Sequence, residues 1–478
     1  MIAIRSRLLR TAAVVALSGA LGACASFTND GGMSPVASRV SLEIGATSAK
    51  IVTPADAAVV RSRVDRLLAK PLTADAAVQV ALLNNRGLQA EYNALGVSEA
   101  EYVEASLPPS PTVSIERVVG SGELDVERRL IADLLQLLTL PRRAKIAETG
   151  FRAAQFKAIA ATFRTASEAR RAYYRAVAAR ETAAFLETAR ASAGAAAELT
   201  KKLGETGAAT KLSQARSGAL YAEVATELAE ARLETAKERE ALTRQLGLWG
   251  RDLDYRLPAR LPSFPRLKTQ GDVEATAIRR RVDIIGDRLE LDELAQSYGL
   301  TEQTRAISML EVTGIANHAR SAEGEKANPK GFEVTVQIPI FDFGKASSAK
   351  ARETYMGAVN RLLEKAVNAR SEAREAYATY RGRHDIARSY QSRVLPLRKV
   401  ITEESQLQYN GMLVDAFELL TNARENVASN VAAIRAKRDF FIADVDFQAA
   451  LIGGGSAAEP AAEPKLASAT SASSASPQ

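Results

Sequence analysis

Few side chains in this 478-residue sequence are of the types that catalyse reactions or bind metal ions. There are two histidines, His318 and His384, and one cysteine, Cys24. His318 follows Asn317 in a predicted loop, and His384 precedes Asp385 on a predicted helix, which favours solvated polar side chains at both places. The HExxH, CxxC and GxxxxGK[ST] patterns do not occur. The sequence therefore predicts no enzyme, no cofactor and no metal site.

The chemistry that we predict for Cys24 is the attachment of a lipid. Basic residues at the N-terminus precede an apolar stretch from Thr11 to Leu21 that is too short to span a bilayer. The Leu-Gly-Ala-Cys run that ends at Cys24 is similar to the cleavage motif of bacterial lipoproteins, and Ala25 resembles those released to the outer membrane. We therefore predict a lipoprotein signal peptide over residues 1–23. The alternative is an ordinary signal peptide with an incidental cysteine.

The composition is typical of long packed helices. Aromatic residues make up 5% of the chain and charged residues 25%, and alanine is abundant. The net charge of +7 would suit a nucleic-acid-binding protein, but acidic and basic residues alternate, as in Glu168–Arg171 and Glu230–Arg232. Such alternation along a helix is typical of a solvated face. The charge pattern therefore argues against nucleic acid as a partner.

The rest of the sequence consists of two similar units. Each contains a helix, a pair of strands and a long helical hairpin. The tail lacks any periodicity and is rich in Ala, Ser and Pro, which predicts disorder. The predicted segments are an extended N-terminal linker over 24–70, a first unit over 71–247, an inter-unit linker over 248–270, a second unit over 271–452 and a disordered tail over 453–478.

In the first unit, a helix over 76–105 ends at a run of prolines, because proline cannot continue a helix. Alternating residues then predict a strand pair within 112–138. A helical pattern over 142–203 follows, which would be roughly 90 Å long at 1.5 Å per residue. The glycines near 204–211 predict the tip of a hairpin, after which the helical pattern returns. A rod of this length is typical of a coiled coil.

The second unit has the clearer strand. Phe332, Val334 and Val336 alternate with polar residues inside a strand pair predicted within 304–340. A second long helical pattern then runs to about 408, where Pro396 predicts a bend or break. Its tip is predicted near 409–418.

The two units match at two landmarks. Pro141 corresponds to Gly344 at the start of the long helices, and Gly207 corresponds to Gly411 at the tips. The two separations are nearly equal, which indicates an internal duplication.

Four strands in one chain cannot close a barrel. An open sheet edge is not viable in lipid, so strands with one apolar face would have to close with those of other copies. Apolar residues outside and polar residues inside are typical of a transmembrane barrel. The alternation alone also fits a strand of a soluble sheet.

With these elements in place, the chain resembles the TolC-type outer-membrane efflux proteins, specifically their lipoprotein branch. Four motifs carry the resemblance. They are Leu72–Asn85, Arg279–Ile284 with Val282 in place of the usual proline, Ile338–Gly344, and Tyr409–Gly411 followed by Glu418-Leu-Leu420.

The resemblance implies a mainly α fold with a small β part. Three chains would form a 12-stranded transmembrane β-barrel, continued by a periplasmic coiled-coil barrel of helices. The implied partners are two further copies of the chain, a periplasmic adaptor, an inner-membrane pump and outer-membrane lipid. The chain would be a passive exit duct for efflux or secretion. Two alternatives are a lipid-anchored periplasmic adaptor and a coiled-coil spacer without a pore.

The resemblance also implies roles for individual residues. It places the strand-to-helix junction at Pro339, Phe341, Asp342 and Gly344, and the periplasmic tips that contact the adaptor at Gly204, Gly207, Lys211, Tyr409, Gly411, Asp415 and Glu418. Lys211 and Asp415 each lie four positions after the glycine of their tip. A mixed entrance of this kind predicts a weaker cation preference than an acidic one. The transported substrate is not indicated.

Overall fold

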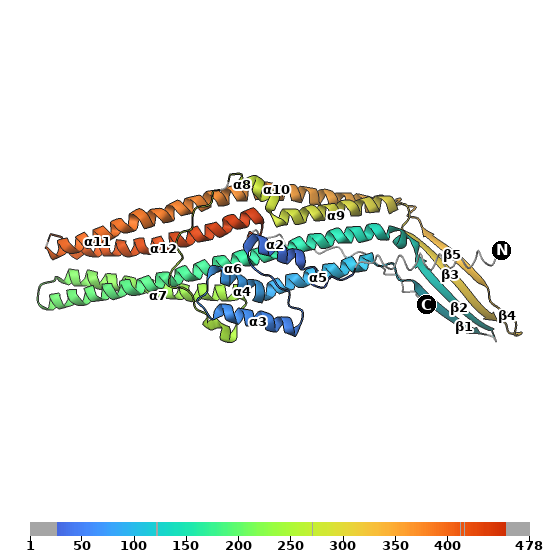
Figure 1. Cartoon of the computed structure of the whole chain (residues 1–478), viewed down its shortest axis with the longest axis horizontal. Coiled ribbons are helices and arrows are strands. Elements are labelled where there is room, and N and C mark those ends of the chain that lie inside the picture. The colour runs from blue at the N-terminus through green and yellow to red at the C-terminus, as the bar shows by residue number, and fades with distance from the viewer. Residues whose placement is uncertain (1–25, 121–122, 270, 412, 415, 456–478) are drawn as a thin grey trace.

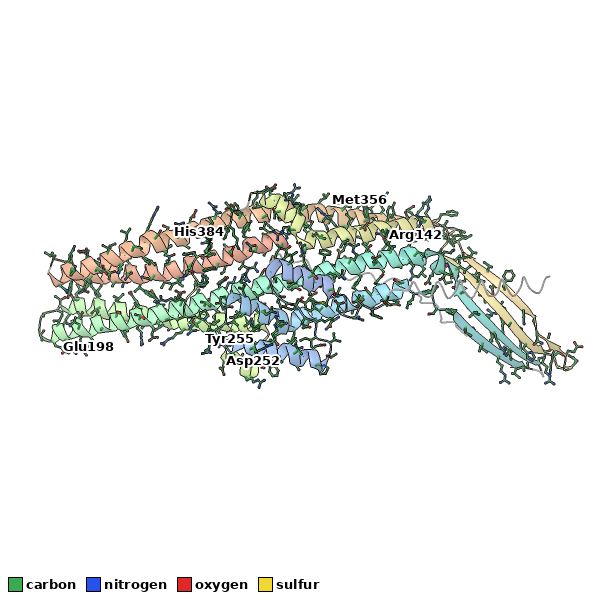
Figure 2. The ribbon with its side chains drawn as sticks, viewed as in Figure 1. Arg142, Glu198, Asp252, Tyr255, Met356 and His384 are labelled. Atoms are coloured by element: carbon green, nitrogen blue, oxygen red, sulfur yellow. The ribbon has the colours of Figure 1, made fainter. Side chains whose placement is uncertain are left out.

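The computed structural model describes residues 26–455, except 121–122, 270, 412 and 415. The molecule is a long bundle of helices with a sheet at one end and two helical hairpin tips at the other (Figure 1). Arg142, near the sheet, and Glu198, near the tips, lie close to the two ends of one continuous helix (Figure 2).

The prediction of an extended linker over 24–70 is wrong, because this segment contains two helices. They are α2 (Ser34–Ile44) and α3 (Pro54–Leu68). Val36 and Val40 of α2 are fully buried, and α2 packs on a long helix of the bundle, α6. Thr53 caps α3 by accepting from the backbone of Asp56, whose carboxylate accepts from the Thr53 backbone in return. The valine spacing and this capping box are helix signals that a loop-like composition obscured.

The helix predicted over 76–105 is two helices, α4 (Ala74–Asn84) and α5 (Arg86–Ser106). Asn85 separates them with an extended backbone, and its side-chain oxygen accepts from the Leu88 N–H at 3.1 Å. An asparagine that caps one helix while ending another produces the break.

The sheet is antiparallel. Its strands are β1 (Thr112–Gly120), β2 (Glu123–Asp133), β3 (Met309–Arg320), β4 (Lys326–Ala327) and β5 (Lys330–Gln337). The order is β1-β2-β3-β5, with the short β4 also paired to β3. Both strand pairs are confirmed, with shorter limits than predicted. The loop predicted at His318 is wrong, because His318 lies within β3.

The first long hairpin consists of α6 (Leu134–Glu205) and α7 (Lys211–Leu246). α6 begins directly after β2, where the Asp133 carboxylate accepts from the Gln136 N–H at 2.8 Å. Pro141 therefore lies inside α6. The matching of Pro141 with Gly344 is wrong, because the junction that corresponds to Gly344 lies at Asp133.

The linker contains the 3-10 turn η2 (Gly250–Asp254), and the described residues of the second unit form five helices besides its strands. They are α8 (Val273–Arg280), α9 (Val282–Thr304), α10 (Lys345–Ser389), α11 (Leu395–Asn410) and α12 (Ala416–Ile452). A π-helical turn, η3 (Tyr390–Val394), separates α10 from α11 directly before Pro396. The predicted irregularity at Pro396 is confirmed, because proline leaves the carbonyl four residues earlier without its helical donor.

The linker between the units crosses the middle of the bundle as an ordered strap. The Leu261 N–H donates to Glu181 on α6 at 2.8 Å, and the Lys437 ammonium on α12 donates to the Leu261 carbonyl at 3.1 Å. The Lys268 N–H donates to the Tyr380 hydroxyl on α10 at 3.1 Å. The strap therefore ties both hairpins together.

His384, expected to be solvated, is only 7% exposed. Its ring lies edge-on to Phe264 of the strap and Phe440 of α12. Figure 2 shows it midway along the bundle. The burial was missed because the two phenylalanines come from segments distant in sequence.

Among the described residues, no helix combines the length and the apolar character needed to cross a membrane.

Candidate functional site

The sheet has one mostly apolar face and one mostly polar face. Residues directly opposite one another in an antiparallel pair lie on the same face, so the strand registers assign every side chain. The apolar face contains Val113, Ile115, Val119, Leu124, Val126, Leu130, Ala132, Leu310, Val312, Phe332, Val334 and Val336. Many are open to solvent in the single chain; Phe332, for example, is 80% exposed. This amount of exposed apolar surface requires a covering that the single chain does not supply.

The opposite face is acidic. It contains Glu116, Glu123, Asp125, Glu127, Asp133, Glu311 and Glu333, together with the apolar Val118, Ile131, Ile315 and Met309. Arg129 is the one basic residue of the described strands on this face, and it forms an ion pair with Glu127. Arg128, its neighbour in the chain, lies on the apolar face, since consecutive residues of a strand point to opposite faces.

Both outer strands have an open edge. Among the described residues, β1 pairs only with β2, and β5 pairs only with β3. β1 spans nine residues and β5 eight, so each edge is long enough to pair with a strand of another chain. The edges are available to strands of other chains.

The junction between β5 and α10 is a tight turn. The Asp342 carboxylate accepts from the backbone N–H groups of Gly344 at 3.0 Å and Ala346 at 3.2 Å. These donors hold the pKa of Asp342 below its usual value. Pro339 begins the turn by accepting from the Phe343 N–H at 2.7 Å.

Gly344 has a φ of +71°, and a Cβ there would lie 2.5 Å from the Arg305 carbonyl oxygen. Phe343 also has a positive φ, of 49°. Phe341 is 98% exposed beside this turn, at the boundary between sheet and bundle. The structure therefore brings Pro339, Phe341, Asp342 and Gly344 together between β5 and α10.

The tip of the first hairpin is a glycine turn. Gly207 has a φ of +77°, and a Cβ at Gly204 would collide with the Gln214 side chain of the returning helix. Thr210 caps α7 by accepting from the Ser213 N–H at 3.1 Å, and Lys211 is the exposed first residue of the helix.

At the second tip, Tyr409 is half-buried and Gly411 ends α11 with a φ of −81°. Glu418 lies in the first turn of α12. Asp415 lies outside the described residues, as does Cys24. The comparison of Lys211 with Asp415 therefore remains a prediction.

Contacts between the two tips were not predicted. The Arg216 guanidinium of α7 lies 4.4 Å from the centre of the Phe417 ring on α12. Two helical turns further from the tips, Arg424 of α12 and Glu223 of α7 form an ion pair at 2.6 Å. These contacts join the two hairpins of one chain near their ends. Sequence spacing could not reveal them, because they lie between helices far apart in the chain.

Two of the sequence motifs fasten helices rather than line a site. The Asn84 amide donates to the carbonyls of Leu246 and Gly247 at 3.1 and 2.7 Å, which fixes the end of α7. In the second unit, Arg281 is only 5% exposed and donates to Asp283 at 2.9 Å and to Glu372 of α10 at 2.5 Å. The second motif thus ties the α8–α9 break to α10.

Metal ligands do not gather in the part of the chain that the structure describes, where no group of three or more His, Cys, Asp or Glu side chains is placed to hold a metal ion.

Comparison with known proteins gives matches at the level of structure. No family model and no curated protein sequence matches the chain. A structure of CusC, described for conformational changes that accompany folding and transmembrane channel formation, has a TM-score of 0.70 at 18% identity and covers 79% of this chain and 91% of its own. The CmeC outer membrane channel of Campylobacter jejuni has a TM-score of 0.64 at 18% identity, with coverages of 84% and 87%.

The open state of the MtrE outer membrane channel of Neisseria gonorrhoeae has a TM-score of 0.67 at 17% identity and covers 79% of this chain and 88% of its own. Because the sequence identities are this low, the matches establish the fold alone. The paired helical hairpins and the antiparallel sheet form the architecture that the motifs predicted. The chain therefore has the fold of the TolC-type outer-membrane channels.

Proposed function

We propose that this protein is a passive outer-membrane channel built from three copies of the chain, the exit duct of a tripartite exporter. The observation that carries the proposal is the sheet, which has an exposed apolar face and two open edges and continues directly into the helical bundle. A lone sheet of this kind is not viable in lipid, whereas a closed barrel is.

Closure by three copies fits the strands. Each chain has four long strands, β1, β2, β3 and β5, so three copies supply twelve. β1 runs away from the helices and β5 runs back toward them, so β1 of one copy would lie antiparallel to β5 of the next. The apolar face would lie against lipid and the acidic face would line the passage.

The helices also have apolar positions left for a neighbouring copy. On α10 and α11 these recur at spacings of three, four and seven residues, which is typical of a coiled-coil seam. They are Met356, Leu363, Val367, Leu397, Val400 and Leu407, all at least 44% exposed in the single chain. Met356 lies on the part of α10 between the middle of the bundle and the sheet (Figure 2). Packed against further copies, these helices would form the wall of a periplasmic tunnel.

The proposed partners follow from this arrangement. The hairpin tips at Gly204–Lys211 and Tyr409–Glu418 would meet a periplasmic adaptor, which links the duct to an inner-membrane pump that supplies the energy. Cys24, with a lipid attached, would add an anchor. Thr28 fits this anchor, because its backbone N–H and its hydroxyl both donate to the buried Glu99 carboxylate at 2.6 Å and hold the start of the described chain against α5.

The proposal is tested with the purified full chain in detergent and in planar lipid bilayers. We expect a particle of three chains that resists cold SDS, dissociates on heating and produces stepwise single-channel currents. A monomeric particle without conductance would reject the channel and favour a coiled-coil spacer. A monomer that binds a pump component would favour the adaptor.

A further inference from the structure

A belt of positive charge lies on the apolar face of the sheet, from the middle of the strands to the end remote from the helices. The strand registers place its five members in three neighbouring rows of the apolar face. We define the basic belt as Arg117, Arg128, Arg320, Lys326 and Lys330, all exposed.

With the exception of Arg129, the charged residues of the described strands are separated by face. All seven strand carboxylates lie on the opposite, acidic face, and Arg129 is the only basic strand residue there. Random placement on alternating strands would mix the signs. The separation means that the basic belt has no acidic neighbour on its own face.

The members of the basic belt have no ion-pair partner within the described chain. Arg129 on the acidic face pairs with Glu127, whereas none of the five belt residues lies within ion-pairing distance of a described carboxylate. Like charges in adjacent rows of a sheet repel one another. The charges of the belt are therefore available to anions from outside the chain.

The belt lies at a defined depth in the membrane. This step rests on the proposed function, a transmembrane barrel. Between the belt and the junction, the same face of β5 is apolar from Phe332 to Val336, about 13 Å of strand at ~3.3 Å per residue. The exposed side chains of Ile338, Ile340 and Phe341 continue the apolar surface beyond the end of β5 toward the helices. Transmembrane barrels present to lipid an apolar band about 25 Å tall, and this surface would supply the part of it next to the helices. With that band in the hydrocarbon, the belt lies at the head groups of the leaflet remote from the helices, which in this orientation is the outer leaflet.

We propose that the basic belt binds the phosphate groups of phosphorylated lipid head groups in the outer leaflet. Arg117 and Arg128 have guanidinium groups that match phosphate with two parallel hydrogen bonds, and Lys330 adds a point charge in the same row as Arg128. At head-group depth, a lipid-facing arginine costs little free energy, whereas at the bilayer midplane it is strongly destabilising. The belt thus fixes the vertical position of the barrel and recruits a shell of phosphorylated lipid.

Lipid binding to the purified trimer tests this proposal, with native mass spectrometry as the readout. Lipid A with both phosphates is compared with dephosphorylated lipid A, which has the same acyl chains. The variant is Arg117→Gln/Arg128→Gln/Lys330→Gln, and the matched control is Arg129→Gln, the next residue in the chain but on the acidic face. Each cation near an anionic surface contributes roughly a factor of five, so the triple variant should lose roughly 100-fold in its preference for the phosphorylated lipid. The control should keep the wild-type preference.

Three results would overturn the proposal: equal binding of both lipids by the wild type, an unchanged preference in the triple variant, or an equal loss in Arg129→Gln. If the triple variant fails to form trimers, the single variants Arg117→Gln and Lys330→Gln decide, each with an expected loss of roughly fivefold. Wild-type conductance is measured in parallel. A channel without phosphate preference refutes the belt alone, whereas phosphate preference without conductance refutes the duct and leaves the belt supported.

Discussion

Arg281 and its carboxylate partners show how a single motif residue supports the fold. The guanidinium lies between Asp283 and Glu372, and Lys365 reaches Asp287 at 2.8 Å and Asp283 at 4.0 Å. Burial raises the pKa of Asp283, but the Arg281 hydrogen bonds and the charges of Arg281 and Lys365 outweigh it and leave the pKa lowered. Burial is the larger effect at Asp287, whose pKa is raised. The two aspartates lie one helical turn apart. The ionised form of Asp283 therefore stabilises the fold, whereas the ionised form of Asp287 destabilises it.

We predict that Asp283→Asn lowers the free energy of unfolding by about 3 kcal/mol, because it leaves the buried Arg281 without its main counter-charge. Asp287→Asn is the matched control and should change it by about 1 kcal/mol or less, because ionised Asp287 is already disfavoured by burial. Urea titration of the helical circular dichroism signal measures both.

The pH dependence follows from the two directions. The folded pKa of Asp283 is lower than its unfolded pKa, so its stabilisation is complete above the unfolded value of about 4 and disappears as the pH falls through the folded value. The difference in free energy of unfolding between wild type and Asp283→Asn should therefore be constant from pH 5 to 7 and shrink below about pH 4. A difference that grows on acidification would contradict this account.

At the scale of residues, the sequence predicts a feature well where one residue needs a particular backbone conformation or local hydrogen bond. Gly344 and Asp342 form the predicted junction because a positive φ and a cap are local properties. The prediction failed for His384, whose burial depends on Phe264 and Phe440 from other segments.

At the scale of elements, the junction between β5 and α10 decides how the sheet meets the bundle. We predict that Gly344→Ala costs about 3 kcal/mol or more, because a side chain there is strained at a φ of +71° and also meets the Arg305 carbonyl. Gly382→Ala on α10 is the matched control. A Cβ there meets no atom within 4 Å, and alanine favours helix by about 1 kcal/mol over glycine.

The yield of SDS-resistant trimers measures this effect. The Gly344→Ala yield should fall well below wild type, while that of Gly382→Ala should equal or exceed it. Equal yields for both variants would mean that the turn is not needed for assembly.

The long helices and all four long strands could be predicted, because periodicity over many residues is a strong indicator. The ends of elements were less predictable. α6 begins at Leu134 because Asp133 caps it, although Pro141 marked a later start. α2 and α3 were missed because their valines are few and the segment is rich in Ser, Thr and Ala. The hairpin contacts between Arg216 and Phe417 depend on tertiary packing and left no pattern in the sequence.

At the scale of the whole molecule, the main feature is the difference between its two ends. Each chain ends at one pole in a sheet with two open edges and at the other in two hairpin tips joined by Arg216 and Arg424 (Figure 1). The strap at Leu261 and Lys268 holds both hairpins at one level between these poles. We propose that further copies of the chain cover the exposed edges of the sheet and the exposed apolar positions of the helices.

The most direct test of this claim is a cysteine scan across the edges proposed to meet. In a Cys24→Ala background, Ser114→Cys on β1 is combined in turn with a cysteine at Glu333, Thr335 or Gln337 on β5, all on the acidic face. The scan covers the unknown stagger between copies, because a disulfide forms only where the two Cβ atoms come within about 4 Å. We predict that one pair gives a covalent band of three chains and nothing larger, and that the single-cysteine variants give none. A ladder of ever larger species, or monomers for every pair, would contradict the closed ring of three.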